Sequence, residues 1–260
     1  MMNLREELKG AATIAVSGHV RPDGDCVGAN LAMYQYLKKL LPEAQVDLYL
    51  ERPGSIFLFL KDTDKIDSSY SNDTKYDIFI ALDCGDAARL GEAEKYFNNA
   101  KKTICIDHHI SNRGFADVNL IEPDASSTCE LIFDLIEKPY MDVEIAKALY
   151  TGIIHDTGVF QYSNMSPKTF RTVGELVSFG FDTTRIIDET FYQKSYVQNQ
   201  ILGRALLESI LFMDGRCIVS VIDKKTMDFY QVEPKSLDGI VNQLRVTRGV
   251  ECAVFLYQVG

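Results

Sequence analysis

The sequence predicts an α/β fold, in which a doubly wound, mostly parallel sheet is followed by a second, smaller and incomplete α/β domain. Two observations indicate this fold. Short apolar runs alternate with longer segments of helical periodicity over roughly the first 160 residues, as in βαβ units. These runs are apolar at nearly every position, which is typical of strands that are covered on both faces.

The predicted elements of the first domain follow one another in a regular order. Strands are predicted at 13–17, 46–50, 77–82 and 103–106. Helices are predicted at 26–41, 87–97, 126–137, 143–154, 167–180 and 183–192. Pro42 ends the first helix, Pro139 follows the third, and Ser166 caps the fifth.

After residue 195 the pattern changes. We predict a long helix over 195–211, a strand over 217–222, an amphipathic helix over 236–246 and a strand over 251–257. This pattern gives a first domain at 1–182, a helical linker at 183–196 and a second domain at 197–260. The second domain would have only about 65 residues and would end in a strand without a partner, so we expect it to be incomplete.

The composition is that of an ordinary globular protein. Hydrophobic residues make up 46% and charged residues 25% of the chain, which excludes extended disorder. The longest apolar runs are much shorter than the roughly 20 residues that span a bilayer, and the N-terminus is charged. We therefore expect a cytoplasmic protein that does not contact a membrane.

Charge and cysteine spacing narrow the classes of ligand. A net charge of −10 argues against binding a long nucleic-acid duplex, although a cleft containing metal ions can still attract a small anionic substrate. The six cysteines are scattered without a CxxC pair. We therefore expect buried free thiols, and neither a zinc knuckle nor a disulfide framework.

Ionisable residues gather where the predicted strands end. They are His19, Asp23 and Asp25 after TIAVSG, Asp83 after DIFIAL, and Asp107, His108 and His109 after TICI. The carboxyl ends of parallel strands share one edge of a sheet, which is where ligands bind. We expect these side chains to meet in one crevice, together with Asp156 from GIIHDTG.

Four carboxylates in one crevice predict two divalent metal ions. Without positive charge, repulsion and desolvation would raise the carboxyl pKa values strongly. Two divalent ions balance the charges of the four aspartates, Asp23, Asp25, Asp83 and Asp156. Imidazoles from His19 and His108 complete a ligand field of nitrogen and oxygen, which is typical of manganese or a similar ion and unlike a thiolate-rich zinc site.

Each motif also has an ordinary explanation when it is taken alone. HVRPDGD can be a simple turn, Asp83 can cap a helix, and His155 can be a satisfied core histidine. Two adjacent histidines at a strand end are harder to explain by packing. The coincidence of four segments favours the metal centre.

The ordered motifs HVRPDGDCVG, ALDCGD, DHHISN and GIIHDTG resemble those of the DHH phosphoesterases. The segment DGIVNQLRVTRGVECAVFLYQ resembles the start of the DHHA1 domain found in one branch, the bifunctional oligoribonucleases (nanoRNases) and 3′-phosphoadenosine-5′-phosphate phosphatases. That branch ends in a glycine-rich GGGH segment, whereas this sequence stops at FLYQVG. The resemblance therefore implies a DHHA1 domain that is truncated.

The resemblance implies a role for each site residue. One manganese ion would be held by His19, Asp23 and Asp83, and the other by Asp25, Asp83, His108 and Asp156, so that Asp83 bridges the two. His109 would face the scissile phosphate and Asp107 would orient both histidines. Asn112 would contact the substrate phosphate or close a turn. Arg245 and Arg248 would bind a phosphate, or complement the C-terminus of a helix.

The implied activity is hydrolysis of short oligoribonucleotides, of 3′-phosphoadenosine-5′-phosphate, or of both, by water that two manganese ions activate. Two alternatives remain open, namely a phosphodiesterase acting on cyclic di-AMP and its linear product pApA, and a nucleotide-binding regulator without turnover. The second domain argues against a family II pyrophosphatase, and the length and acidity argue against a RecJ-type exonuclease. A homodimer is compatible with each of these functions.

Overall fold

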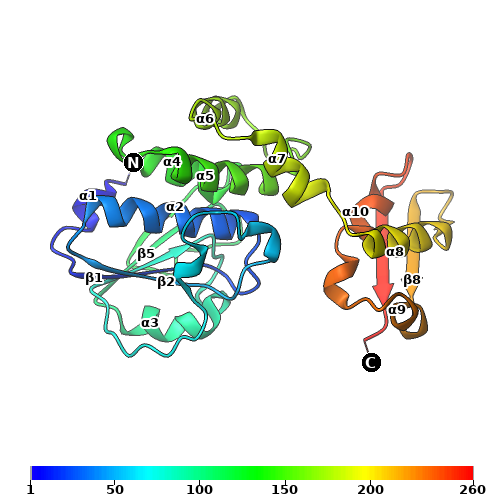
Figure 1. Ribbon diagram of the computed structural model, residues 1–260, viewed down its shortest axis with the longest axis horizontal. Helices are drawn as coiled ribbons and strands as arrows, with labels where there is room; N and C mark the ends of the chain where they lie inside the picture. The colour runs from blue at the N-terminus through cyan, green and yellow to red at the C-terminus, as the bar shows by residue number, and fades with distance from the viewer. Residues whose placement is uncertain (1, 260) are drawn as a thin grey trace. The chain divides into compact units, whose positions relative to one another are not determined.

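The computed structural model describes residues 2–259. The chain divides into two compact units, Met1–Tyr192 and Gln193–Gly260. Both units combine helices with a sheet (Figure 1). The α/β fold predicted from the sequence is therefore confirmed.

The first unit contains a six-stranded sheet in which every pairing is parallel. The strand order is β3-β2-β1-β4-β5-β6. From β1 the chain adds β2 and β3 on one side of the sheet. It then crosses back, and β4, β5 and β6 follow on the other side of β1. The strands are β1 (Thr13–Ser17), β2 (Gln45–Tyr49), β3 (Ile66–Asp67), β4 (Ile78–Leu82), β5 (Lys102–Asp107) and β6 (Val118–Ile121).

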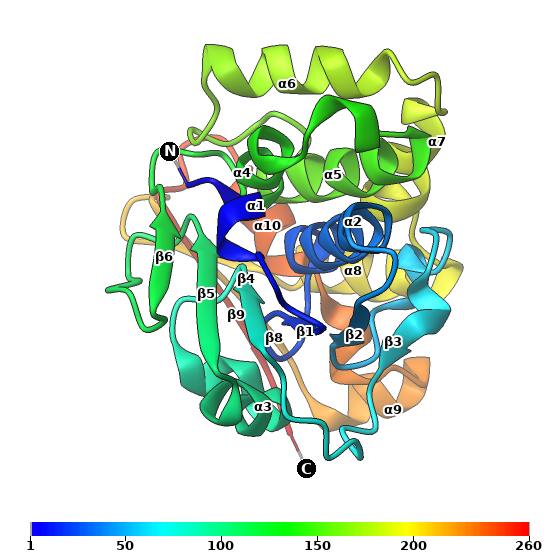
Figure 2. The same cartoon turned by 90° about the vertical axis from the view of Figure 1, so that its left-hand side faces the viewer.

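Helices cover both faces of this sheet (Figure 2). A large core joins α2, α4 and α5 to one face, and a smaller, Tyr- and Phe-rich core joins α3 to the other. The helices are α1 (Leu4–Glu7), α2 (Gly24–Leu40), α3 (Glu94–Asn99), α4 (Thr128–Leu135), α5 (Val143–Asp156), α6 (Pro167–Val177) and α7 (Thr183–Ile187), with a π-helix, η5 (Asp188–Tyr192). The short 3₁₀ helices are η1 (Ser55–Phe57), η2 (Thr63–Lys65), η3 (Ala87–Ala93) and η4 (Lys138–Tyr140).

The structure differs from the sequence prediction at the sheet edges and at one helix. The edge strands β3 and β6 were not predicted, because they are short and only partly buried. The helix predicted over 87–97 is broken at Gly91, which has φ +56°. A Cβ atom there would lie 2.4 Å from Val20 Cγ1, so this position requires glycine, and the chain kinks within η3.

The second unit is a three-stranded sheet of order β7-β8-β9 packed against helices. Its elements are α8 (Tyr196–Leu207), β7 (Ile210–Phe212), β8 (Cys217–Ile222), α9 (Lys224–Tyr230), η6 (Pro234–Leu237), α10 (Ile240–Arg245) and β9 (Cys252–Tyr257). The helix predicted over 195–211 ends at Leu207, and its last residues belong to β7. The expectation of a final strand without a partner was wrong, because β9 pairs in parallel with β8.

Within residues 2–259, the helices are too short or too polar for any of them to cross a membrane.

Candidate metal centre

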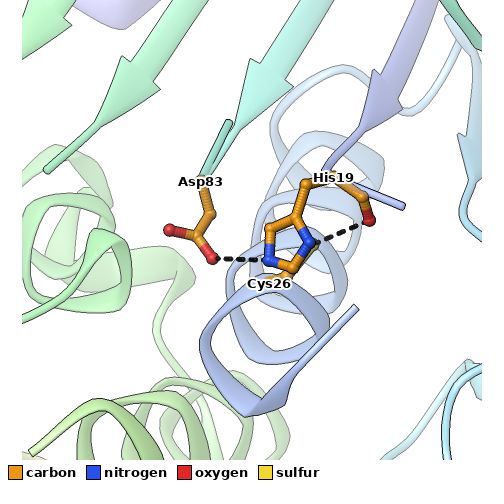
Figure 3. Close-up of side chains that lie close together, drawn as sticks. All are labelled: His19, Cys26 and Asp83. Atoms are coloured by element: carbon orange, nitrogen blue, oxygen red, sulfur yellow. Dashed lines mark hydrogen bonds and ion pairs between the residues drawn. The ribbon is translucent and has the colours of Figure 1, made fainter. Parts of the chain in front are cut away.

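The centre begins between β1 and β4, the two strands at which the strand order reverses. His19 follows β1 and Asp83 follows β4, and Figure 3 shows the imidazole pointing at the carboxylate. His19 Nε2 lies 3.5 Å from Asp83 Oδ2 and 3.7 Å from Asp23 Oδ2. In open parallel sheets this reversal point is where the strand ends leave a ligand crevice.

The ring of His19 is oriented by the backbone. Its Nδ1 lies 2.8 Å from the carbonyl oxygen of Val20, which can only accept a hydrogen bond. The proton of a neutral imidazole must therefore sit on Nδ1, and Nε2 keeps a lone pair that faces the two carboxylates. This is how proteins usually prepare a histidine to bind a metal ion.

Asp83 is buried and adopts a strained backbone conformation. Its side chain is 2% exposed and its φ is +54°, in the left-handed region that a residue with a Cβ rarely occupies. The backbone N–H still donates to the carbonyl of Ile106 at 3.0 Å. Such strain persists where a fixed side-chain direction is needed, and it is concentrated at functional sites.

His108 faces the second oxygen of the same carboxylate. Its Nε2 lies 3.3 Å from Asp156 Oδ2, 3.7 Å from Asp83 Oδ1 and 3.9 Å from Asp25 Oδ2. Its Nδ1 lies 3.3 Å from the carbonyl oxygen of Ala125, which directs the Nε2 lone pair toward the acids. Asp83 thus presents one oxygen to His19 and the other to His108.

Asp23 has two roles, one for each oxygen. Its Oδ1 accepts hydrogen bonds from the backbone N–H groups of Asp25 and Cys26 at 3.1 Å and caps α2, while Oδ2 faces His19. One oxygen of Asp23 therefore has an ordinary local role, although that role is a helix cap and not only the simple turn considered for HVRPDGD. It leaves the other oxygen available to a ligand.

The carboxylates are crowded and lack sufficient positive charge. Burial, together with the charges of Asp83 and Asp156, raises the pKa of Asp25 well above its usual value. Burial, together with the charge of Asp83, raises the pKa of Asp156 to about 6, although His108 opposes this shift. Burial lowers the pKa of His19, but hydrogen bonds with Asp23 and Asp83 outweigh burial and raise it. The cluster therefore favours positive charge at its centre.

This donor set fits divalent metal ions. Ligand atoms about 2.1 Å from a shared ion lie about 3–4 Å from one another, as the histidine nitrogens and carboxylate oxygens do here. Among the described residues, three groups of side chains could each hold an ion on geometric grounds, namely His19, Cys26 and Asp83; Asp83, His108 and His109; and Asp25, His108 and Asp156.

Glycine lets α5 approach the centre. A Cβ atom at Gly152 would lie 2.9 Å from Asp25 Oδ1 and 2.2 Å from Cys129 Sγ, which leaves no space for a side chain. Asp25 is 1% exposed and accepts hydrogen bonds at the N-terminus of α4, from Thr128 N at 2.7 Å and Cys129 N at 3.0 Å. Partial positive charge at a helix N-terminus stabilises a carboxylate.

His109 is held differently from His108. Its Nδ1 donates to Asp107 Oδ1 at 2.7 Å, so the nitrogen nearest to Asp83 is already committed. The hydrogen bond to Asp107 raises the pKa of His109. Its side chain is 33% exposed, whereas that of His108 is 14% exposed. The two adjacent histidines are therefore suited to different tasks.

The structure bears on the expected roles of Asn112 and Asp107. Asn112 is buried, donates to Asp107 Oδ2 at 2.7 Å and to the Cys84 carbonyl, and accepts from Gly114 N at 2.8 Å. Its amide thus supports Asp107 and the loop, which is the turn role that was one of the two alternatives for Asn112. Asp107 orients His109, whereas the ring of His108 is held by the backbone of Ala125, contrary to the expectation that Asp107 orients both.

The remaining sequence candidates are Arg245, Arg248 and His155. Arg245 is in the last turn of α10 and Arg248 follows that helix, both in the second unit. A cation in this position complements the helix C-terminus, as the alternative explanation of these arginines expects. His155 packs against the rings of Phe57 and Phe191, and its Nε2 lies 2.9 Å from Thr190 Oγ1, as for a satisfied core histidine.

Sequence analysis missed the residues at the start of α4. Thr128 Oγ1 donates to Asp83 Oδ1 at 3.1 Å, in addition to the backbone bonds to Asp25. Cys26, expected only as a buried thiol, lies beside His19 and Asp83 (Figure 3). The string ASSTCE carried a usable signal for Thr128, because Ser127 followed by Glu130 is typical of a helix N-terminus.

Known proteins match nearly the whole chain in sequence. The chain is 28% identical to the bifunctional oligoribonuclease and PAP phosphatase NrnA of Thermus thermophilus over 94% of its own length and 72% of that protein. It is 24% identical to the protein of that name in Bacillus subtilis over 95% of its length and 78% of the relative.

Solved structures share the fold. An exopolyphosphatase-related protein from Bacteroides fragilis superposes with a TM-score of 0.87 at 23% identity, covering 95% of this chain and 76% of the other. A putative family II inorganic pyrophosphatase from Methanococcus jannaschii gives a TM-score of 0.52 at 15% identity, covering 94% and 82%. The model of the DHH family, N-terminal domain, matches residues 13–153, which contain β1 to β6, α2 and α4. The chain therefore belongs to the DHH family.

Proposed function

We propose that this protein is a phosphoesterase that uses two manganese ions to hydrolyse short oligoribonucleotides, 3′-phosphoadenosine-5′-phosphate, or both. One observation carries the proposal: the two oxygens of Asp83 each face the Nε2 atom of a different, pre-oriented histidine. A carboxylate in this position is suited to bridge two ions. The NrnA relatives, which match nearly the whole chain, support the nucleotide substrate.

The proposed ligands follow from the distances. His19, Asp23 and Asp83 would hold one ion, and Asp83, Asp25, His108 and Asp156 the other. Nitrogen and oxygen ligands of this kind suit manganese. When bound, the two ions would lower the pKa of water and neutralise charge that develops on the phosphoryl group.

The chain's own residues would complete the site. His109 donates through Nδ1 to Asp107, and its raised pKa favours a second proton on Nε2. That proton can be donated to a non-bridging phosphate oxygen as negative charge develops there. Asp107 keeps the ring in place, and Asn112 keeps Asp107 in place. No covalent bond between substrate and protein is required.

Cyclic di-AMP or its linear product is the second candidate substrate. The chain is 25% identical to the cyclic-di-AMP phosphodiesterase GdpP of Bacillus subtilis over 88% of its own length and 37% of that protein. The greater share of each NrnA protein that is covered favours the first candidate. A regulator without turnover is less well supported, since the six expected ligand positions are all occupied by suitable side chains.

The direct test is hydrolysis of di-adenylate, 3′-phosphoadenosine-5′-phosphate and cyclic di-AMP, with manganese and after chelation. We expect release of mononucleotide from di-adenylate that depends on manganese. Binding of all three nucleotides without any product would favour the regulator and contradict the proposal.

A further inference from the structure

A short backbone segment, Ala125–Cys129, organises one side of the centre. It makes four hydrogen bonds to site side chains: Ala125 O with His108 Nδ1 at 3.3 Å, Thr128 N with Asp25 Oδ2 at 2.7 Å, Cys129 N with Asp25 Oδ1 at 3.0 Å, and Thr128 Oγ1 with Asp83 Oδ1 at 3.1 Å. The three side chains, those of His108, Asp25 and Asp83, are all proposed ligands of the second ion. The position of this segment therefore sets the geometry of that subsite.

Glu130 fixes the segment. Its side chain is 1% exposed, and its Oε2 accepts hydrogen bonds from the backbone N–H of Ser126, at 3.2 Å, and from the hydroxyl of Ser126. The same oxygen accepts from Thr169 Oγ1 at 2.9 Å, at the start of α6. Ser126 is adjacent to Ala125, whose carbonyl contacts His108. Through Glu130, Ser126 is therefore connected to both α4 and α6.

Helix capping alone does not account for this arrangement. A glutamate at the third position of a helix usually reaches back to the backbone N–H of the N-cap residue. The N-cap of α4 is Ser127, but Glu130 reaches one residue farther, to Ser126, and also across to Thr169. Burying a carboxyl group is costly, and a cap does not require it. The extra contacts are explained if the segment must be held rigid.

A second contact supports the same conclusion. Asn164 Nδ2 donates to the carbonyl of Ser126 at 2.9 Å and to the carbonyl of Asp156 at 3.1 Å. The residue that Glu130 holds is thus also connected to the backbone of the Asp156 ligand. The segment therefore contacts Asp25 and His108 directly and is linked to the backbone of Asp156 through Asn164.

We propose that Glu130 is a positioning residue for the second metal subsite, the one formed by Asp25, His108 and Asp156. This inference rests on the proposed function, because it presumes two ions. It assigns Glu130 no contact with substrate. It requires that loss of Glu130 weakens the binding of the second ion. The affinity for the ion held by His19 and Asp23 should be unchanged.

The test is calorimetric titration of the full chain with manganese, using E130A, E130Q and the control D134N. Asp134 lies on the same helix and pairs with Lys168 at 2.5 Å, as Glu130 does at 3.7 Å, but it does not contact Ser126. We expect E130A to weaken one binding step about 10–100-fold, the range typical for residues that orient metal ligands. E130Q should weaken it less, because its oxygen can still accept from Ser126, and D134N should bind as the original protein does.

The double variant D23N/E130A identifies the weakened step, because D23N alone retains the ligands of the second subsite. We expect E130A to weaken the binding of the ion that D23N still holds. Two unchanged steps in a folded E130A protein, or equal weakening of both, would overturn the inference while leaving the proposed function intact. An original protein that binds fewer than two ions would refute the proposed function and this inference together. If E130A does not give a thermal unfolding transition, E130Q decides by the same criteria.

Discussion

The two halves of the centre are built in different ways. The local half, His19 and Asp23, comes from the single loop between β1 and α2, and the carbonyl of the next residue orients its histidine. The assembled half, Asp25, His108 and Asp156, comes from α2, the end of β5 and the end of α5, and the backbone of Ala125 orients its histidine. Asp83 joins the two halves.

This difference has a physical consequence. A half built from one loop needs few long-range contacts, so distant substitutions should leave it intact. A half built from three segments is only as well ordered as the packing between them. The assembled half should therefore be the more sensitive of the two.

The largest effect is expected when the residue shared by both halves is changed. Replacing Asp83 by alanine removes an oxygen ligand from each ion, so we expect no hydrolysis of di-adenylate and fewer than two manganese ions per chain. Metal analysis and an activity assay measure this. The control is D77N, which changes a carboxylate next to the opposite end of β4. Retention of two ions by D83A would show that Asp83 does not bridge.

Separate changes in each half should divide the effect. D156N should weaken binding of the ion in the assembled half, and D23N should weaken binding of the ion in the local half, because asparagine lacks the charge of a carboxylate. We expect each loss to exceed the roughly 10–100-fold typical of residues that only orient ligands. Asparagine can still cap α2, so D23N should fold normally. Identical binding curves for the two variants would contradict a centre with two distinct halves.

A change at His109 should affect neither half. H109A removes a donor to the phosphate, so we expect kcat to fall about 10²–10³-fold, as when an oxyanion donor is lost. Manganese affinity should be unaltered in a titration of the same preparation. If an ion is lost instead, His109 is a ligand and the roles of the two histidines are exchanged.

The smallest effect is expected at Cys26 in the local half. Burial raises the pKa of this thiol to about 12, so it remains protonated at neutral pH. Manganese prefers the nearby oxygen and nitrogen donors to a protonated sulfur. C26A should therefore bind both ions with nearly unchanged affinity. A clear loss of the first binding step in C26A would place Cys26 among the ligands.

The sequence was sufficient for the parts of the fold that depend on short-range signals. Thr13–Ser17 was predicted with the bounds that the structure shows, because its three central residues are all apolar. The strand at 66–67 was missed because two residues carry no periodicity. The region 224–230 was missed as a helix, and β7 was placed inside a helix, because neighbouring segments decide these short elements.

The candidate site shows the same limit. Strand-end histidines and aspartates could be found because a parallel sheet brings strand ends to one edge. The support that orients them could not be read from spacing. Asp107 holds one histidine instead of two, Asn112 holds Asp107, and the Ala125 carbonyl holds His108. These contacts depend on the packing of β5, β6 and α4, which no local pattern encodes.

The most direct test of the central claim is a manganese titration followed by electron paramagnetic resonance. Two ions that share the carboxylate of Asp83 would interact magnetically. We predict two manganese ions per chain and a spectrum of an exchange-coupled pair. A single uncoupled ion at saturation would contradict the account.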